Sequence, residues 1–487
     1  MSNVKPLLST TAPATTHSAV SVVMWPLMLV LFISTLDQTI VATALGRIGD
    51  VLGNPADAPW IATAYLLTSA ISTLIFGKLG DMVGRKQIFQ VSVAVFVAGS
   101  ALCALAPTMA WLIGFRALQG IGGGGLNSLV MAIVGDLVPA RERARYQATL
   151  GVIPAIAIIL GPVIGGLIVD HWNWAWIFLI NVPIGMLAFF IISARLHLPR
   201  HTQSHRLDIM GAALSILFTT SFLLVAVQGG NAYPWGSWQI LGMIGIGVVT
   251  LTAYLLVEWN AAEPITPLSL FASDIFCVSS ALFFLTTAAL FVGMLFVPLM
   301  LQKVFGLSAF AAGGCIVPML LGLIAATMVT GTVISNTGRY RIFPIMGSLF
   351  AGCGLFALSQ VQLTTPLWWI LLVLTVFGAG LGLFIQVVVL AGQNAIEHRH
   401  LGVATGTLNF FKTLGGATGA AIFGAVLTRG MVDATSPEQI LFAFHAVFFG
   451  ALAMTGISLL LALLLREKPL SPEMVDVAEG RIDVPEY

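Results

Sequence analysis

The stretch Gly77-Lys78-Leu79-Gly80-Asp81-Met82-Val83-Gly84-Arg85-Lys86 is a short polar segment between two long apolar runs. A related segment, Gly331-Thr332-Val333-Ile334-Ser335-Asn336-Thr337-Gly338-Arg339, stands in the same setting in the second half of the chain. Two glycines and an arginine recur at the same offsets, and Ser335 stands where the first segment has Asp81. The chain therefore contains two related halves.

A second pair of segments supports this repeat. The second apolar run after the first polar segment contains Gln119-Gly120-Ile121-Gly122-Gly123-Gly124. The matching run in the second half contains Phe377-Gly378-Ala379-Gly380-Leu381-Gly382. Chance similarity is the alternative in a chain with 50 glycines, but two matches in the same order argue against it. Duplicated halves with a substrate bound between them are the usual architecture of secondary transporters.

The composition restricts the class of protein further. Of the 487 residues, 58% are hydrophobic and only 8% are charged, against roughly 25% charged residues in a typical soluble domain. So few charges cannot cover the surface of a soluble protein of this length, which excludes a soluble enzyme. The net charge of +1 gives no electrostatic reason to expect nucleic acid as a partner. The four cysteines all lie in apolar runs, so we expect no disulfide framework.

The apolar runs are long enough to cross a bilayer, and spans in lipid must be helical to satisfy their backbone. We therefore predict an all-α polytopic membrane protein. Its predicted spans are 22–45, 59–78, 88–107, 109–134, 147–169, 173–195, 208–228, 238–257, 275–302, 309–334, 342–360, 366–393, 402–428 and 438–465.

The fourteen spans divide into two sets of six and one inserted pair. We predict an N-terminal tail at 1–20, a six-helix bundle at 21–195, a linker with two additional helices at 196–272, a second six-helix bundle at 273–466 and a C-terminal tail at 467–487. With both termini in the cytoplasm, 16 of the 21 Lys and Arg residues fall on the cytoplasmic side. This bias is the usual determinant of orientation, so we expect both ends of the chain in the cytoplasm.

Asp37 is the only carboxylate deep inside a predicted span, and such a group is functional by default because its burial is costly. Arg116 lies at a matching depth: the two residues are ~12 and ~11 Å from the outer ends of spans one and four at the rise of a helix. Burial favours the neutral form of Asp37, and a nearby cation favours its charged form. We interpret Asp37 as the proton-binding group and Arg116 as its constant positive neighbour; a permanently paired structural ion is the alternative.

Other polar side chains in the spans are candidates for contact with substrate. Arg116 is expected to hold Gln119 or Asn127. Lys412 could face the cavity or extend its ammonium to the membrane surface, and the sequence does not separate these alternatives. The full set of cavity candidates is Gln119, Asn127, Asn181, Gln386, Asn409 and Lys412.

The segment 77–86 is expected to be a mechanical element that controls opening. Its glycines permit a tight turn, and Asp81 is expected to accept N–H groups at the start of the following span. We expect Arg85 to pair with a carboxylate across the boundary between the halves. Asp136, with Arg141 and Arg145, is expected to repeat this chemistry at the next loop. The gating residues are thus Gly77, Gly80, Asp81, Gly84, Arg85, Lys86, Asp136 and Arg145.

In these motifs the chain resembles the major facilitator superfamily, and more closely its fourteen-span drug:proton antiporters of the QacA/EmrB type. The resemblance rests on the 77–86 loop, on Arg116 with Gln119 and Gly120, and on segments 36–41 and 177–183. It also rests on Gly161, Pro162, Gly165 and Gly166, which match the motif that marks exporters in that superfamily. Departures include Ala42, Gly46, Met82, Ala175 and Lys412 at positions where the family often has other residues.

The resemblance implies the major facilitator fold, with two six-helix bundles plus two inserted helices. It also implies a proton-coupled antiporter that exports amphipathic drugs or toxic compounds by alternating access from the bacterial cytoplasmic membrane. Small amphipathic substrates, protons and the lipid bilayer are then its partners. We expect no cofactor and no metal, with the proton gradient as the driving force, and a monomer.

Two other functions remain open from sequence. A dedicated exporter of one endogenous metabolite or peptide would fit the same fold, although few convergent polar groups are visible. A membrane-embedded enzyme would need clustered His, Asp or Glu inside the spans, where only Asp37 and His445 occur. Residues 120–125 lack the Lys-Ser/Thr that follows the glycines of a phosphate-binding loop, so ATP is not expected to drive transport.

Overall fold

A computed structural model of the chain describes residues 17–52, 57–138, 140–196, 208–230, 232–261, 264–397, 400–432 and 436–468. Within those ranges every regular element is a helix, and fourteen candidate spans are long and apolar enough to cross a membrane. The predicted all-α polytopic fold with fourteen spans is confirmed. Most of the two predicted tails lies outside the described residues.

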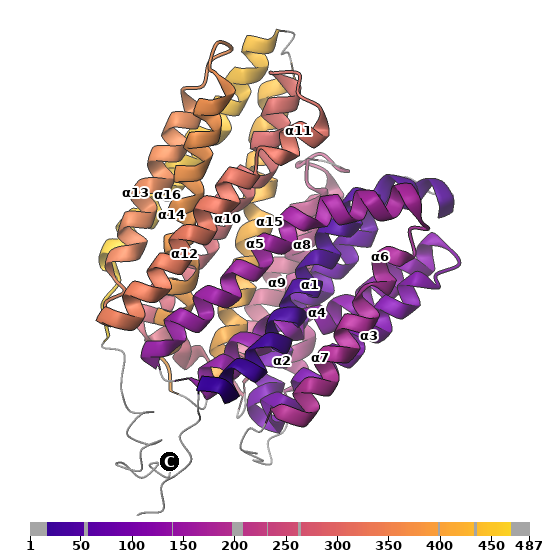
Figure 1. The fold of residues 1–487 in the computed structure, drawn as a ribbon, viewed down its shortest axis with the longest axis vertical. Coiled ribbons are helices and arrows are strands. Elements are labelled where there is room, and N and C mark those ends of the chain that lie inside the picture. The colour runs from indigo at the N-terminus through magenta and orange to yellow at the C-terminus, as the bar shows by residue number, and fades with distance from the viewer. Residues whose placement is uncertain are drawn as a thin grey trace, which may run out of the picture.

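The N-terminal half consists of the helices up to Arg195, coloured indigo to magenta in Figure 1. They are α1 (His17–Leu52), α2 (Ala58–Val83), α3 (Arg85–Ala104), α4 (Met109–Leu137), α5 (Ala140–His171), α6 (Trp176–Leu179) and α7 (Asn181–Arg195).

Two inserted helices and the C-terminal half follow. The inserted helices are α8 (Ile209–Gln228) and α9 (Trp238–Asn260), and a short 3-10 helix, Leu268–Ala272, leads into the second half. The second half contains α10 (Asp274–Lys303), α11 (Ala309–Gly314), α12 (Val317–Thr337), α13 (Ile342–Ser359), α14 (Leu367–Asn394), α15 (Leu401–Met431) and α16 (Pro437–Leu464).

Two predicted spans are each divided into a short and a long helix. In span six, α6 ends at Leu179, and in span ten, α11 ends at Gly314. Pro183 and Pro318 stand four residues after these ends. A proline ring inside a helix collides with the carbonyl group four residues earlier and removes an N–H donor, so each helix is interrupted at that position.

Several helices extend beyond the apolar run that predicted them. The first predicted span, 22–45, lies inside the longer α1, and the fifth, 147–169, lies inside α5. Hydropathy marks only the part of a helix that sits in hydrocarbon, whereas the helix itself continues into the polar interface. The extra turns of α5, residues 140–146, carry Arg143 to the end of α4, and Gln147 follows directly at the boundary between the halves.

The two halves meet at the end of the molecule that carries the 77–86 loop, called here the loop end. There α2 packs against α15, and α5 packs against α12 and α14. We call this contact surface the seam. From the loop end the ribbons of the two halves diverge toward the other, far end of the molecule (Figure 1). The structure thus shows a state that is closed at the loop end.

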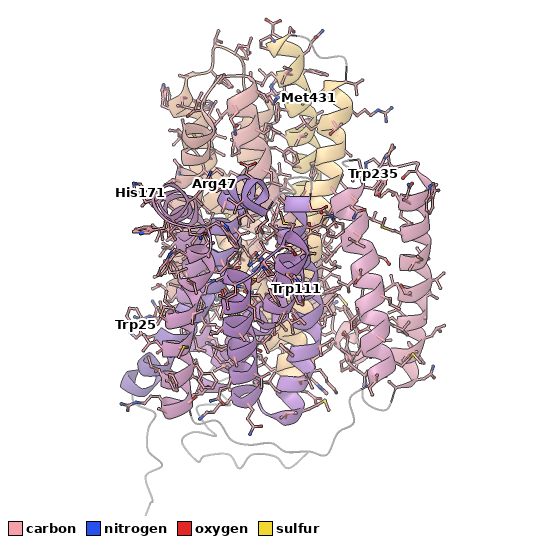
Figure 2. The ribbon with its side chains drawn as sticks, turned by 90° about the vertical axis from the view of Figure 1, so that its right-hand side faces the viewer. Trp25, Arg47, Trp111, His171, Trp235 and Met431 are labelled. Carbon is pink, nitrogen blue, oxygen red and sulfur yellow. The ribbon has the colours of Figure 1, made fainter. Side chains whose placement is uncertain are left out.

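The inserted helices stand beside the seam. α8 and α9 pair with each other, and α8 contacts α2 of the first half and α15 of the second. Figure 2 shows this pair at one side of the molecule, with Trp235 at its far end. The rings of Phe218, Tyr254 and Phe410 join α8, α9 and α15, with centroids 5.2 and 5.9 Å apart. The insertion therefore rests on both halves.

Candidate functional site

A buried ion pair lies inside the N-terminal half. Arg116 of α4 donates from one terminal nitrogen to Oδ2 of Asp37 on α1, and the two side chains are 1% and 0% exposed. The pairing predicted from matching depth is confirmed. Since both groups are removed from solvent, loss of either partner would leave an uncompensated charge in a medium of low polarity, which typically costs about 3–5 kcal/mol.

Two amide side chains complete the environment of the carboxylate. Gln119 and Asn181 donate to Oδ1 of Asp37 at 2.9 and 2.8 Å. Both amides also donate to Oγ of Ser100 on α3, each at 3.0 Å, and that hydroxyl donates to the carbonyl of Phe178 at 3.0 Å. Arg116, Gln119 and Asn181 all act as donors to the carboxylate of Asp37 in this network.

Arg116 is held at several points besides Asp37. Its guanidinium donates to Oε1 of Gln119 at 2.7 Å and to the carbonyl of Ile61 at 3.2 Å. It also lies over the ring of Tyr65, 4.4 Å from the centroid, and 5.7 Å from that of Phe178. The cation is therefore fixed by hydrogen bonds and by aromatic faces. We call Asp37, Ser100, Arg116, Gln119 and Asn181 the polar cluster.

The break between α6 and α7 places Asn181 in this cluster. Asn181 is the first residue of α7, directly after the interruption that Pro183 imposes. Its Oδ1 is buried without a hydrogen-bond partner, although its amide group makes two bonds. Asn181 therefore keeps one unused acceptor beside the carboxylate of Asp37.

The remaining cavity candidates lie elsewhere. Asn127 donates to the carbonyl of Gly123 at 3.0 Å, within α4. Gln386 and Asn409 are buried in the C-terminal half, and Asn409 donates to the carbonyl of Thr405 at 3.1 Å. Lys412 is partly exposed, with its ammonium 6.0 Å from the ring centroid of Phe283. The structure thus groups Gln119 and Asn181 with Asp37 and leaves the other candidates apart.

The 77–86 loop makes a different contact from the one expected. Asp81 accepts from the backbone N–H of Gly402 at 3.0 Å and of Val403 at 2.8 Å, in the first turn of α15. The expectation that Asp81 would bind the start of the following span was wrong, because that helix begins only at Arg85, beyond the turn at Gly84. Asp81 instead binds the positive end of a helix in the other half, where an anion is favoured.

Gly84 and Gly77 explain how that contact forms. Gly84 has φ +116°, a conformation that other residues rarely adopt, and it reverses the chain between α2 and α3. A Cβ at Gly77 would lie 2.7 Å from the carbonyl oxygen of Gly402, so only glycine lets α2 approach α15 this closely. At Gly80 a Cβ would lie 2.6 Å from Leu129 of α4.

Arg85 pairs within its own half. It binds Asp81 through two nitrogens, at 2.8 and 3.1 Å, and it also binds Asp136. The expected pair across the boundary was therefore wrong, since the carboxylate of Asp136 at the end of α4 is nearer. Lys86 donates to the carbonyl of Ser193 on α7 at 3.0 Å.

The basic residues after Asp136 also differ from expectation. Arg143 donates to the carbonyls of Gly135 and Val138, at 2.5 and 2.9 Å, and so caps the end of α4. Arg145 is exposed, and the side chain of Arg141 lies outside the described part. Sequence reasoning missed Arg143, although an arginine in the first turn of α5 is well placed to reach the unsatisfied carbonyls of the preceding helix.

The exporter motif packs on the helix that carries Asp37. A Cβ at Gly161 of α5 would collide with Oγ1 of Thr39, which donates to the carbonyl of Ala157 at 3.3 Å. Gly165 is buried, and Gly166 faces open space. α5 runs through Pro162, whose side chain is outside the described part. The motif therefore links α1 to α5, which itself forms part of the seam.

Comparison with known proteins identifies the family. The Major Facilitator Superfamily model matches residues 27–420. An uncharacterized MFS-type transporter of Mycobacterium tuberculosis is 34% identical over 503 residues, covering 95% of this chain and 73% of that protein. The multidrug transporter protein MdtP of Bacillus subtilis is 36% identical over 402 residues, covering 82% of this chain and 74% of that protein.

A solved structure shows the same fold. The proton:xylose symporter XylE superposes with a TM-score of 0.63 at 13% identity, covering 94% of this chain and 99% of that one. The family model and the relatives named as transporters identify the chain as a membrane transporter and not an enzyme. The chain belongs to the major facilitator superfamily, and its fourteen spans are consistent with the drug:proton antiporter type.

Proposed function

We propose that this protein exports small amphipathic compounds in exchange for protons, with Asp37 as the proton-binding group. The observation that carries the proposal is the fully buried carboxylate of Asp37 in contact with Arg116, Gln119 and Asn181. The name of its relative MdtP, a multidrug transporter protein, supports the substrate class. Multidrug efflux and antibiotic resistance are the physiological roles we propose.

Protonation of Asp37 would alter the contacts among three helices. A proton on Oδ2 competes with the donor from Arg116, and a neutral carboxyl holds the amides of Gln119 and Asn181 less strongly. These partners lie on α4 and α7, while Asp37 lies on α1. Because α1 contacts α5 at Thr39 and α5 contributes to the seam, a change at Asp37 can reach the loop end through packed helices.

We propose that the loop end faces the cytoplasm and that the protein lies in the bacterial cytoplasmic membrane as a monomer. The support for this orientation is the excess of Lys and Arg on the side of both termini. In that orientation the contacts of α2 with α15 and of α5 with α14 correspond to a state closed toward the cytoplasm. No resident cofactor is included in the proposal, and the proton gradient supplies the driving force.

Export in inverted membrane vesicles tests this function. A fluorescent amphipathic dye such as ethidium should accumulate when the vesicle interior is made acidic, and nigericin, which dissipates the pH gradient, should abolish the accumulation. A panel of toxic compounds tested on an efflux-deficient host then shows whether one substrate or many are exported. Dye accumulation that persists with nigericin would contradict proton coupling.

A further inference from the structure

The seam contains a second, uncharged contact, between α5 and α14. Nε2 of Gln147 on α5 donates to Oε1 of Gln393 on α14 at 2.6 Å. Nε2 of Gln393 donates in turn to Oγ1 of Thr405 on α15 at 2.8 Å, and that hydroxyl donates to the carbonyl of Leu401 at 2.7 Å. One chain of hydrogen bonds therefore joins α5 of the first half to two helices of the second.

The side chains in this series of hydrogen bonds are buried, so the series forms only when the loop end is closed. Gln147, Gln393 and Thr405 are at most 1% exposed. Gln147 and Gln393 belong to different halves, so they can bury each other only when the halves touch. A buried amide that loses its hydrogen-bond partner costs more free energy than an amide that can bond to water. The hydrogen bond therefore stabilises the closed seam, and closure of the seam in turn allows the bond to form.

A neighbouring contact extends the same polar strip toward the membrane middle. Gln386 of α14 lies over Gly151 of α5, where a Cβ would collide with its amide nitrogen. Gly151 is one helical turn beyond Gln147, and Gln386 is two turns before Gln393, as expected where one helix leaves the loop end and the other arrives. Oε1 of Gln147 and Oε1 of Gln386 are both buried without hydrogen-bond partners. These acceptors could be hydrated if the halves separated.

We propose that Gln147 and Gln393 are positioning residues that hold the loop end closed, separately from the charged contact of Asp81. The inference rests on the proposed function, because closure matters only for a transporter that alternates between two states. The Asp81 contact joins α2 to α15, and the Gln147 contact joins α5 to α14. The two contacts fasten the seam on different helix pairs, so opening toward the loop end requires both to break.

The test measures the separation of the halves directly. Spin labels are attached at Glu142→Cys on α5 and Arg339→Cys after α12, both exposed positions, in a protein whose four native cysteines are replaced by alanine. Pulsed electron paramagnetic resonance then gives the fractions of closed and open loop ends in nanodiscs, without substrate or gradient. Gln393→Leu should raise the open-to-closed ratio about fivefold or more, which corresponds to about 1 kcal/mol for one net hydrogen bond.

Two further variants decide whether the effect belongs to this contact. Gln147→Leu should shift the ratio in the same direction, and the double variant should match Gln393→Leu alone, because both remove the same bond. Gln90→Leu is the matched control: its amide bonds Ser193 at 2.7 Å within one half, so the ratio should stay at the wild-type value.

Unchanged distances in Gln393→Leu, with thermal stability retained, would overturn the proposal. An equal shift in Gln90→Leu would also overturn it, because the effect would then be a general loss of packing. The proposed export function is tested separately by dye accumulation. If the wild-type protein accumulates no dye but Gln393→Leu still opens the loop end, only the export function is refuted.

Discussion

At the scale of single residues, Arg116 is the group on which the site depends most. It cannot lose its proton in a protein, so its charge requires Asp37 or another acceptor at all times. The carbonyl of Ile61 and the face of Tyr65 stabilise it further, which explains how a full cation is tolerated at this depth. Of the two paired groups, only the carboxylate of Asp37 can bind or release a proton.

We expect Arg116→Gln to lower the thermal stability of the protein in detergent, because it leaves the charge of Asp37 buried and unpaired. The loss should correspond to about 3–5 kcal/mol. Combining it with Asp37→Asn should restore much of the lost stability, since the double variant buries no charge at this position. Fluorescence-detected thermal unfolding gives the comparison, and losses that simply add in the double variant would contradict the pairing argument.

The residue scale also shows what sequence could predict. The pairing of Asp37 with Arg116 can be predicted from the sequence, because charges are rare in the spans and depth can be counted along a helix. The contacts of Ser100, Gln147 and Gln393 cannot be predicted in this way, because serine and glutamine occur in many spans and the helices are apolar around most of their circumference. Which face of such a helix meets a neighbour is decided by packing across the whole molecule, not by local pattern.

At the scale of elements, the helix count followed from apolar length, whereas helix ends and partners did not. The interruptions near Asn181 and Ile316 follow from prolines four residues after the last helical residue, a signal present in the sequence. The partner of Asp81 could not be predicted, since it depends on α15 beginning beside α2, although the two lie more than 300 positions apart along the chain.

Gly77→Ala should force α2 away from α15, because the added Cβ meets the backbone carbonyl of Gly402 and not a flexible side chain. We expect the open fraction at the loop end to rise in the spin-label measurement described above. Gly114→Ala on α4 is the control, since nothing lies within 4 Å of its Cβ position. If the two variants behave alike, the close approach of α2 and α15 does not control closure.

Asp81→Asn should slow transport while leaving equilibrium binding of substrate nearly unchanged. The variant keeps one acceptor for the N–H groups of α15 but removes the charge that favours the helix terminus and pairs with Arg85. Turnover in proteoliposomes and dye binding in nanodiscs separate the two quantities. A large loss of binding would place Asp81 in the substrate site and refute a gating role.

At the scale of the whole molecule, the polar cluster and the seam are separate structures joined by α1 and α5. The cluster lies inside one half, and the two hydrogen-bonded contacts of the seam fasten α2 and α5 to the other half. Of the inserted helices, α8 lies across the same boundary, against α2 and α15. We propose that coupling between a proton on Asp37 and movement of the halves passes through helix packing, with the contact of Thr39 against Gly161 as its link.

We propose that a proton on Asp37 drives export, and transport by the variant Asp37→Asn under an imposed pH gradient decides whether it does. The purified variant is reconstituted in liposomes, and ethidium movement is followed with and without an imposed pH gradient. We predict that Asp37→Asn still equilibrates the dye down its own gradient but accumulates none against it, whereas wild type accumulates it until nigericin is added. Uphill accumulation by Asp37→Asn equal to that of wild type would contradict the account.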